Sequence, residues 1–263
     1  MQEKKNFKIQ STKKTRYILP NVLTLIGVCL GISSIKFSLD QNYSLAVIFI
    51  VLAALLDALD GRIARLIHGT SEFGKELDSL TDFVSFGIAP AFIIYFWELN
   101  NFGKVGWAIT LIFSVCCVLR LARFNLTKIN ENESWKLNYF EGIPSPAGGI
   151  LILLPLIYEL SSLETQYNLK IITPYLVILI AALLVSKIPT FSLKKISIPR
   201  KLTIFIFLGI GTVFVCLVFF TFETLFILGI IYLILIPLSS FIFYKNKKNS
   251  TVSIQEDEHE DIL

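Results

Sequence analysis

Four aspartates in one short stretch are the residues whose types and spacing best suit chemistry. They are Asp57, Asp60, Asp78 and Asp82. Residues three or four positions apart lie on one face of a helix, so each pair presents two carboxylates to the same side. Sites made only of oxygen ligands suit hard divalent cations such as Mg²⁺ and Mn²⁺. The spacing therefore predicts a metal site, formed where the faces of the two pairs oppose each other.

Small residues and an arginine accompany the first aspartate pair. Gly61, Ala64 and Arg65 fall with that pair within an arc of about 140° around a helix. The glycine and the alanine leave room for a bulky ligand to approach the backbone. Two divalent ions held close together can clamp the oxygens of a diphosphate. The expected ligand is therefore a phosphate-containing substrate.

The elements that position these residues are membrane helices. Of the 263 residues, 54% are hydrophobic and 17% are charged, and the mean hydropathy is +0.68. A soluble domain has about 25% charged residues, so this composition excludes a soluble globule and a mostly disordered chain. The net charge of +4 does not indicate a nucleic-acid partner, because the basic residues lie between apolar stretches rather than in one stripe.

Eight apolar stretches approach the length of about 20 residues that a spanning helix needs. The predicted fold is all-α and polytopic, with spans near 17–38, 43–59, 78–99, 104–124, 145–161, 171–188, 202–221 and 224–244. In this assignment the first aspartate pair ends one helix and the second pair begins the next. Of the 24 lysines and arginines, 21 lie on one side of the membrane, which places both termini in the cytoplasm.

Three regions follow from this assignment. Residues 17–244 form a transmembrane domain in the cell (inner) membrane, with the aspartates facing the cytoplasm. Residues 1–16 are a basic cytoplasmic arm, which either contacts anionic lipid or only sets the orientation. Residues 245–263 run from basic to acidic and are predicted to be a disordered cytoplasmic tail.

Two other interpretations of the aspartates stay open. They could form only structural ion pairs with Arg62, Arg65 and Lys75 where helices end. They could instead line the path of a cation or proton transporter. A transporter is expected to carry such acids nearer the middle of a span, often in broken helices, whereas these acids cluster near one end. Ionisable residues within membrane segments are costly and usually functional, which favours a site over structural pairing.

The aspartates belong to a longer pattern. It reads Asp57-x-x-Asp60-Gly61-x-x-Ala64-Arg65, then eight residues, then Gly74-x-x-x-Asp78-x-x-x-Asp82. This pattern resembles the complete signature of the CDP-alcohol phosphatidyltransferases, with all of its defining positions present at the family's spacing. The resemblance implies that the four aspartates bind two divalent ions, Mg²⁺ or Mn²⁺, and that Asp82 is the general base.

The same resemblance implies a binding site for CDP-diacylglycerol. The residues that it assigns to this substrate are Asp57, Gly61, Ala64, Arg65, Ser71, Gly74 and Asp78. Upstream, the stretch from Pro20 to Thr24 resembles the first-helix segment that lines the same site, which adds Asn21 and Thr24. Simple capping at the start of a helix would also explain Pro20 and Asn21.

Two later segments are candidates for binding the acceptor alcohol. They are residues 119–125, with Arg120, Arg123 and Asn125, and residues 140–149, with Gly142, Pro144 and Ser145. Arg120 and Arg123 are three residues apart and are expected to project together. Paired guanidinium groups suit a carboxylate or a phosphate, although snorkelling and positive-inside orientation would also explain two arginines here.

Both segments resemble the bacterial, integral-membrane branch of the family, which uses L-serine. With the signature, the resemblance covers residues 17–150 and implies a homodimer that transfers a phosphatidyl group from CDP-diacylglycerol to L-serine, releasing CMP. Gly27 stands where the branch that makes phosphatidylglycerophosphate tends to have an arginine. A sister enzyme that uses choline, glycerol phosphate or inositol phosphate stays an alternative, as does an ion transporter.

Overall fold

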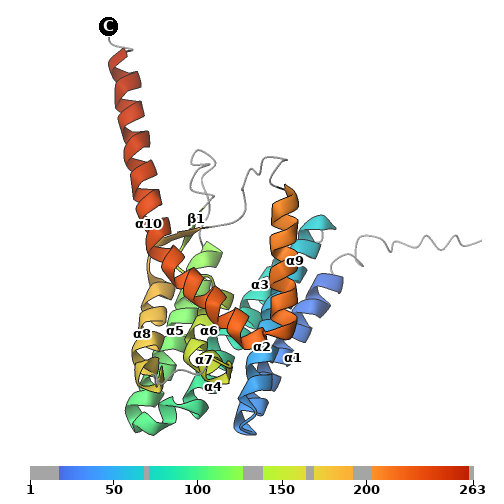
Figure 1. Ribbon diagram of the computed structural model, residues 1–263. Coiled ribbons are helices and arrows are strands. Elements are labelled where there is room, and N and C mark those ends of the chain that lie inside the picture. The colour runs from blue at the N-terminus through green and yellow to red at the C-terminus, as the bar shows by residue number, and fades with distance from the viewer. Residues whose placement is uncertain (1–17, 68–70, 127–138, 164–168, 192–202, 261–263) are drawn as a thin grey trace, which may run out of the picture.

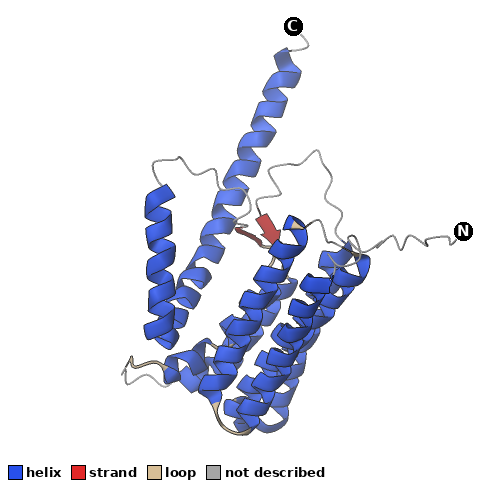
Figure 2. Ribbon diagram, turned by 90° about the vertical axis from the view of Figure 1, so that its right-hand side faces the viewer, coloured by secondary structure: helices blue, strands red, loops and turns tan. Residues whose placement is uncertain are grey.

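The structure is a computed structural model, and it describes residues 18–67, 71–126, 139–163, 169–191 and 203–260. The predicted basic arm at residues 1–16 lies outside the described residues. Helices run roughly alongside one another in a bundle, and a short two-stranded sheet lies at one end of it (Figure 1, Figure 2). The strands β1 (Tyr139–Glu141) and β2 (Pro189–Phe191) are antiparallel.

The helices follow the predicted apolar stretches. Their bounds are α1 Ile18–Leu39, α2 Tyr43–Leu66, α3 Glu72–Asp82, the π-helix η2 Phe83–Ile88, α4 Ala89–Trp97, the 3₁₀-helix η3 Leu99–Phe102, α5 Gly103–Leu126, α6 Ser145–Ile152, α7 Leu154–Leu160, the 3₁₀-helix η5 Leu169–Ile172, α8 Thr173–Val185, α9 Thr203–Phe219 and α10 Thr221–Glu260.

Within the described residues, five helical segments are long and apolar enough to cross a membrane. They are Ile18–Leu39, Tyr43–Leu66, Glu72–Trp97, Leu99–Leu126 and Thr221–Phe243. The predicted class, an all-α polytopic membrane protein, is thereby confirmed. The other three predicted spans coincide with shorter helices: the α6–α7 pair, the segment Leu169–Val185 and α9. The count of eight therefore stays a prediction.

The α6–α7 pair is interrupted because of a proline. α6 ends at Ile152, and α7 begins at Leu154 with Pro155 in its first turn. Proline has no backbone N–H to donate and its ring obstructs the preceding turn, so a continuous helix is broken at this point. The fifth predicted span is thus two short helices rather than one.

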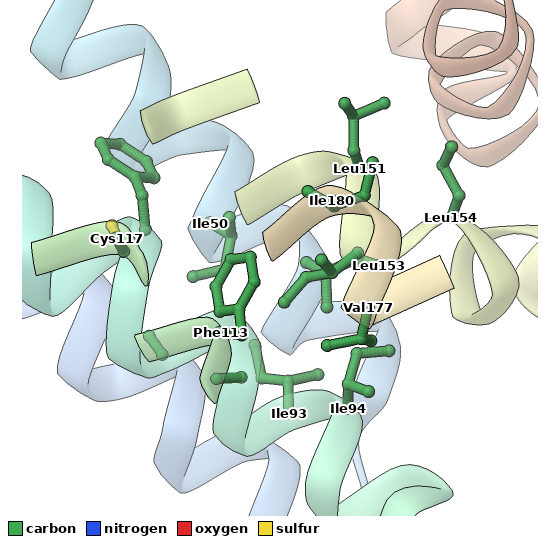
Figure 3. Close-up of a cluster of buried hydrophobic side chains, with 14 of the residues drawn as sticks. Ile50, Ile93, Ile94, Phe113, Cys117, Leu151, Leu153, Leu154, Val177 and Ile180 are labelled. Carbon is green, nitrogen blue, oxygen red and sulfur yellow. The ribbon is translucent and has the colours of Figure 1, made fainter. Parts of the chain in front are cut away.

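The core of the bundle lies where α2, α4, α5, α6 and α8 meet. Phe113 of α5 and Ile50 of α2 are fully buried there, together with Ile93 of α4 and Ile180 of α8 (Figure 3). Large apolar side chains on the outer faces are exposed, and they are most numerous on α9. Apolar residues that line a spanning helix on all sides suit a lipid environment.

α2 is longer than the sequence predicted. It continues to Leu66, so Asp57 and Asp60 lie within the helix rather than at its end. In its last turns Arg65 Nε donates to the Gly61 carbonyl at 2.9 Å. Extending an existing helix needs no new nucleation, so α2 runs past the apolar stretch from which its end was predicted.

α3 begins before the predicted span. Its first residue is Glu72, so Asp78 and Asp82 lie near its C-terminal end and not at the beginning of a helix. Ser71 sets this start, because its Oγ accepts a hydrogen bond from the Gly74 N–H at 3.0 Å and caps the helix. All four aspartates therefore lie inside two consecutive helices.

A π-helical turn, η2, joins α3 to α4 without a break. It starts directly after Asp82 and packs closely against α1. Ser85 of η2 donates its hydroxyl to the Gly27 carbonyl at 3.1 Å. A Cβ added at Gly31 would come within 2.9 Å of the Ser85 backbone, so only glycine allows this approach. Single π-turns within α-helices are frequent at functional sites.

The end of α10 differs from the predicted disordered tail. α10 stays helical to Glu260, and its last turns project away from the bundle (Figure 1). The apolar first part of α10 supplies the helical nucleus, so the polar residues that follow can extend it at little cost.

Candidate active site

Three aspartates from two helices form a cluster. Asp57 and Asp60 of α2 and Asp78 of α3 each contribute one carboxylate oxygen, and the three oxygens lie within 4.8 Å of one another. The faces of α2 and α3 that carry the aspartates therefore oppose each other, as their spacing predicted. Like charges this close repel one another unless a cation or a proton lies among them.

Asp82 adjoins this cluster from one turn further along α3. Its carboxyl group lies close enough to that of Asp57 for the two to interact electrostatically. Ser145 Oγ donates to Asp82 Oδ2 at 3.3 Å. The other oxygen, Oδ1, is buried and has no hydrogen-bond partner among the described residues. Buried polar atoms are normally partnered, so Asp82 presents an oxygen that is suited to a ligand.

The donor set fits a hard divalent cation. It consists of carboxylate oxygens alone, which is the chemistry that Mg²⁺ and Mn²⁺ favour. Because the carboxyl groups of Asp57 and Asp82 also lie near each other, a cation held among them would stabilise both charges. The acidic cluster predicted from the sequence is confirmed for Asp57, Asp60 and Asp78. The kind and number of ions stay predictions.

The first helix supports the cluster. Thr24 of α1 donates its hydroxyl to Asp60 Oδ2 at 2.7 Å, and its oxygen also lies 3.0 Å from the Pro20 carbonyl oxygen. Thr24 and Asp60 are both buried. Asn21 lies beside the start of α3, because a Cβ added at Gly74 would come within 3.2 Å of Asn21 Oδ1. Both predicted residues of α1 thus face the helices that carry the aspartates.

Apart from the aspartates and the two α1 residues, the residues assigned to CDP-diacylglycerol lie on the last turns of α2 and at the start of α3. A Cβ added at Gly61 would meet no described atom within 4 Å, so the backbone there is open to a ligand. Arg65 is exposed and Ala64 is half-buried. Ser71 uses its hydroxyl to cap α3. Binding of the substrate by these residues stays a prediction.

Arg120 reaches the cluster from α5. It is buried, and its Nη1 donates to Ser145 Oγ, the hydroxyl that in turn donates to Asp82. Arg120 Nε is buried as well and has no hydrogen-bond partner among the described residues. Two residues predicted for the acceptor, Arg120 and Ser145, therefore lie beside the predicted general base.

The expectation that Arg120 and Arg123 project together is wrong. Arg123 donates to the carbonyls of Val185 at 2.8 Å, Ser186 at 2.9 Å and Glu141 at 3.4 Å. The last carbonyls of a helix lack partners within the helix and attract cations. Arg123 therefore caps the end of α8, while Arg120 alone faces the aspartates.

Asn125 and the turn before α6 surround the site. Asn125 Nδ2 donates to the hydroxyl of Ser79, the neighbour of Asp78 on α3, at 3.0 Å. Gly142 has φ of +74°, and a Cβ there would come within 2.9 Å of two carbonyl oxygens at the end of α8. Only glycine suits that position. Pro144 directly precedes α6 and so places Ser145 at its first position.

Sequence reasoning missed Thr190, which lies near the acceptor side. Thr190 of β2 is buried and donates its hydroxyl to the Gly142 carbonyl at 2.7 Å. Thr190 belongs to no motif and lies far along the chain from Arg120, so no pattern in the single sequence indicates it.

The chain matches the CDP-alcohol phosphatidyltransferase family over residues 17–193. This region is more than half of the chain and contains every residue that the sequence assigned to the site. The protein therefore belongs to the CDP-alcohol phosphatidyltransferase family.

Several relatives are similar to this chain over most of its length. The chain is 36% identical over 183 residues to the CDP-diacylglycerol–serine O-phosphatidyltransferase of Mycobacterium tuberculosis (strain ATCC 25618 / H37Rv), covering 69% of this chain and 64% of that protein. For the protein of that name from Helicobacter pylori (strain ATCC 700392 / 26695), identity is 35% over 199 residues, covering 76% of this chain and 82% of the relative. The protein of the same name from Methanocaldococcus jannaschii (strain ATCC 43067 / DSM 2661 / JAL-1 / JCM 10045 / NBRC 100440) is 32% identical to this chain over 190 residues. The match covers 72% of this chain and 79% of the relative. The chain thus spans less than two thirds of the mycobacterial relative.

Proposed function

We propose that the protein transfers the phosphatidyl group of CDP-diacylglycerol to L-serine, producing phosphatidylserine and CMP. The observation that carries the proposal is the position of Asp82, which lies beside the cluster of Asp57, Asp60 and Asp78 and is linked to Arg120 through Ser145. The names of the relatives support serine as the acceptor.

The aspartates would hold and orient the diphosphate end of the substrate. Two divalent ions bound there would neutralise its charge and stabilise the negative charge that develops on the departing CMP. Asp57, Asp60 and Asp78 supply the carboxylates for this site. Thr24 fixes the orientation of Asp60 through its hydrogen bond. The open backbone at Gly61 leaves room for the nucleotide to lie against α2.

Asp82 would act as the general base. It takes the proton of the serine hydroxyl while that oxygen attacks the phosphorus that bears the diacylglycerol, and the bond from this phosphorus to CMP breaks. A carboxylate is a weak base, so correct positioning of the two substrates must supply much of the rate. Ser145 holds Asp82 Oδ2 in place at 3.3 Å.

Arg120 would bind the carboxylate of serine. Its side chain is buried beside Asp82, and its Nε has no hydrogen-bond partner within the part of the chain that the structure describes, so it can form a charge-assisted hydrogen bond with an anion. A guanidinium in this position would also select an acceptor that carries a carboxylate. The turn from Gly142 to Ser145 completes this side of the site.

The arrangement in the membrane is part of the proposal. The site lies toward the end of the bundle that carries α3 and the sheet, opposite the α1–α2 turn (Figure 1). The charge distribution assigns three basic residues to the side of the membrane opposite the site. One of them, Lys170, lies over the ring of Trp97 at the end of α4. We infer eight crossings within residues 17–244, cytoplasmic termini and site, acyl chains that leave sideways into the bilayer, and a homodimer.

The test is release of CMP by the purified protein in lipid vesicles that contain CDP-diacylglycerol and Mg²⁺ or Mn²⁺. Release that requires L-serine, with phosphatidylserine as the lipid product, supports the proposal. Release that requires choline, glycerol phosphate or inositol phosphate instead identifies a sister transferase. No release from folded protein, together with cation flux across the vesicle membrane, would contradict transfer chemistry and support a transporter.

A further inference from the structure

α10 lies beyond the region that matches the family, which ends at residue 193, yet it is bound to strand β2. Ser239 of α10 is buried and donates its hydroxyl to the carbonyl of Pro189 in that strand. Pro189 is buried as well, where α10 passes beside the two-stranded sheet (Figure 1). This hydrogen bond therefore fixes β2 against a part of the chain that the family match does not include.

The strand β2 in turn holds the residue that begins the turn before α6. Gly142 directly follows the paired residues of β1, and its N–H donates to the Ile188 carbonyl at 2.9 Å. Thr190 of β2 is 2% exposed, and its hydroxyl donates to the Gly142 carbonyl at 2.7 Å. Both polar groups of the Gly142 backbone are thus bound by β2 and by the residue just before it.

The segment from Gly142 to Ser145 is short and constrained. At Gly142, φ is +74°, and a Cβ there would come within 3.0 Å of three carbonyl oxygens at the end of α8. Ile143 is fully buried. The ring of Pro144 fixes its own φ and restricts the residue before it. The position of this segment therefore depends on the contacts that hold Gly142.

Ser145, at the other end of this segment, connects the two groups that act on the acceptor. It is buried, its Oγ accepts from Arg120 Nη1, and it donates to Asp82 Oδ2 at 3.3 Å. A hydroxyl has only one hydrogen to donate, so the hydrogen of Ser145 is already used. A displacement of the segment would disturb both of these hydrogen bonds at once.

We propose that Thr190 is a positioning residue for the acceptor: its hydroxyl fixes the turn that carries Ser145, and Ser239 holds the strand on which Thr190 lies. Use of the alcohol thereby depends on α10, a helix outside the family-matched region. This inference rests on the proposed function, because it concerns the acceptor in the same reaction. It does not depend on which alcohol is used.

The test uses the full-length protein with Thr190→Val, which removes the hydroxyl and nearly keeps the shape of the side chain. One lost hydrogen bond corresponds to a change of up to about tenfold. We expect kcat/KM for L-serine to fall by about three- to tenfold, with the KM for CDP-diacylglycerol unchanged. Thr190→Ser keeps the hydroxyl and should retain the kcat/KM of the unaltered protein.

Thr173→Val is the matched control. Thr173 is fully buried, and its hydroxyl donates to the Leu169 carbonyl at the start of α8, whereas the Gly142 turn meets the end of that helix. This variant also loses a buried hydroxyl, but it should leave kcat/KM for serine and the KM for CDP-diacylglycerol unchanged. Thermal unfolding is recorded for every variant, and all assays are run below the lowest transition.

Ser239→Ala tests the contribution of α10. It should lower kcat/KM for serine selectively, by a smaller factor than Thr190→Val, because β2 stays paired with β1. The double variant Thr190→Val, Ser239→Ala should be less impaired than the product of the two single effects, since both changes act on one chain of contacts. Effects that multiply fully would show that α10 does not act through Thr190.

An unchanged kcat/KM for the acceptor in Thr190→Val would overturn the inference. An equal effect on both substrates would overturn it as well, as would a loss in Thr190→Ser that matches the loss in Thr190→Val. Failure of the proposed function looks different, because the unaltered protein would then release no CMP with serine. If it uses another alcohol, the same variants are measured with that alcohol, and the expected selective effect is the same. If it uses none, both proposals are wrong.

Discussion

The two sides of the site are built in different ways. The metal side comes from consecutive helices: Asp57 and Asp60 on α2 and Asp78 on α3, supported by Thr24 on α1. The acceptor side is assembled from α5, the turn before α6, β2 and α10, and hydrogen bonds of Arg120, Thr190 and Ser239 join these elements. The metal side therefore depends on local helix geometry, and the acceptor side depends on the packing of the whole bundle.

This difference predicts two kinds of failure. Changes on the metal side should stop transfer to any acceptor, since they affect the shared diphosphate. Changes on the acceptor side should alter the use of the alcohol and leave the binding of CDP-diacylglycerol intact. The following experiments test the separation.

Removal of metal should have the largest effect. Chelation with EDTA is expected to abolish CMP release, because uncompensated carboxylates cannot bind a diphosphate. Mg²⁺ or Mn²⁺ added afterwards should restore activity, whereas buffer alone should not. Full activity after exhaustive chelation would show that the aspartates have a structural role and that transfer needs no metal at this side of the site.

The substitution Asp82→Asn should have the second-largest effect on activity. Loss of the general base is expected to reduce kcat by about 10²- to 10⁴-fold, measured as CMP release at saturating substrates. Asp40→Asn is the control, because Asp40 pairs with Lys36 after the end of α1, away from the site, and it should retain full activity. Equal activity of Asp82→Asn and the unaltered protein would assign the proton transfer to another group.

Substitutions of the two arginines distinguish an effect on acceptor binding from an effect on the stability of the fold. Arg120→Ala should raise the KM for serine by about tenfold or more, because a hydrogen bond to a charged group is lost, with little change in the KM for CDP-diacylglycerol. Arg123→Ala should instead lower the thermal unfolding temperature, since it removes the cap of α8. A selective effect of Arg123→Ala on serine would contradict the structural role given to Arg123.

Thr24→Val should have the smallest effect of the four changes. It removes the hydrogen bond to Asp60 and is expected to raise the Mn²⁺ concentration needed for half-maximal activity by about tenfold, without a selective change in the KM for serine. Thr212→Val is the control, because Thr212 of α9 is exposed and donates its hydroxyl to the Leu208 carbonyl of its own helix. A serine-specific effect of Thr24→Val would show that the metal side and the acceptor side are not independent.

The sequence predicted the metal side well because its geometry is local. Helical spacing alone places Asp57 with Asp60 and Asp78 with Asp82, and these predictions need no knowledge of the tertiary fold. The helix ends were predicted less well, because hydropathy follows the apolar stretch, whereas capping by Ser71 decides where α3 begins.

The acceptor side could be predicted only in part. Arg120 and Ser145 are in recognisable segments, but the sequence pattern does not distinguish Arg120 from Arg123 as the arginine that faces the site. Only the packed structure shows that unpartnered carbonyls at the end of α8 bind Arg123. Thr190 gave no signal at all, because its contact with Gly142 depends on how β2 pairs with β1.

The π-turn after Asp82 has a consequence for how this protein tolerates insertions and deletions. A π-turn closes between residues five apart and an α-turn between residues four apart, so η2 holds one more residue than an ordinary helix would need there. Deleting one residue between Val84 and Gly87 would therefore convert η2 to α-helix and keep Asp82 aligned with the buried face of α4. Conversion of η2 to α-helix without a deletion would instead rotate Asp82 by about 100° relative to that face. The aspartates and the bundle core thus share one continuous helix because the π-turn absorbs the extra residue.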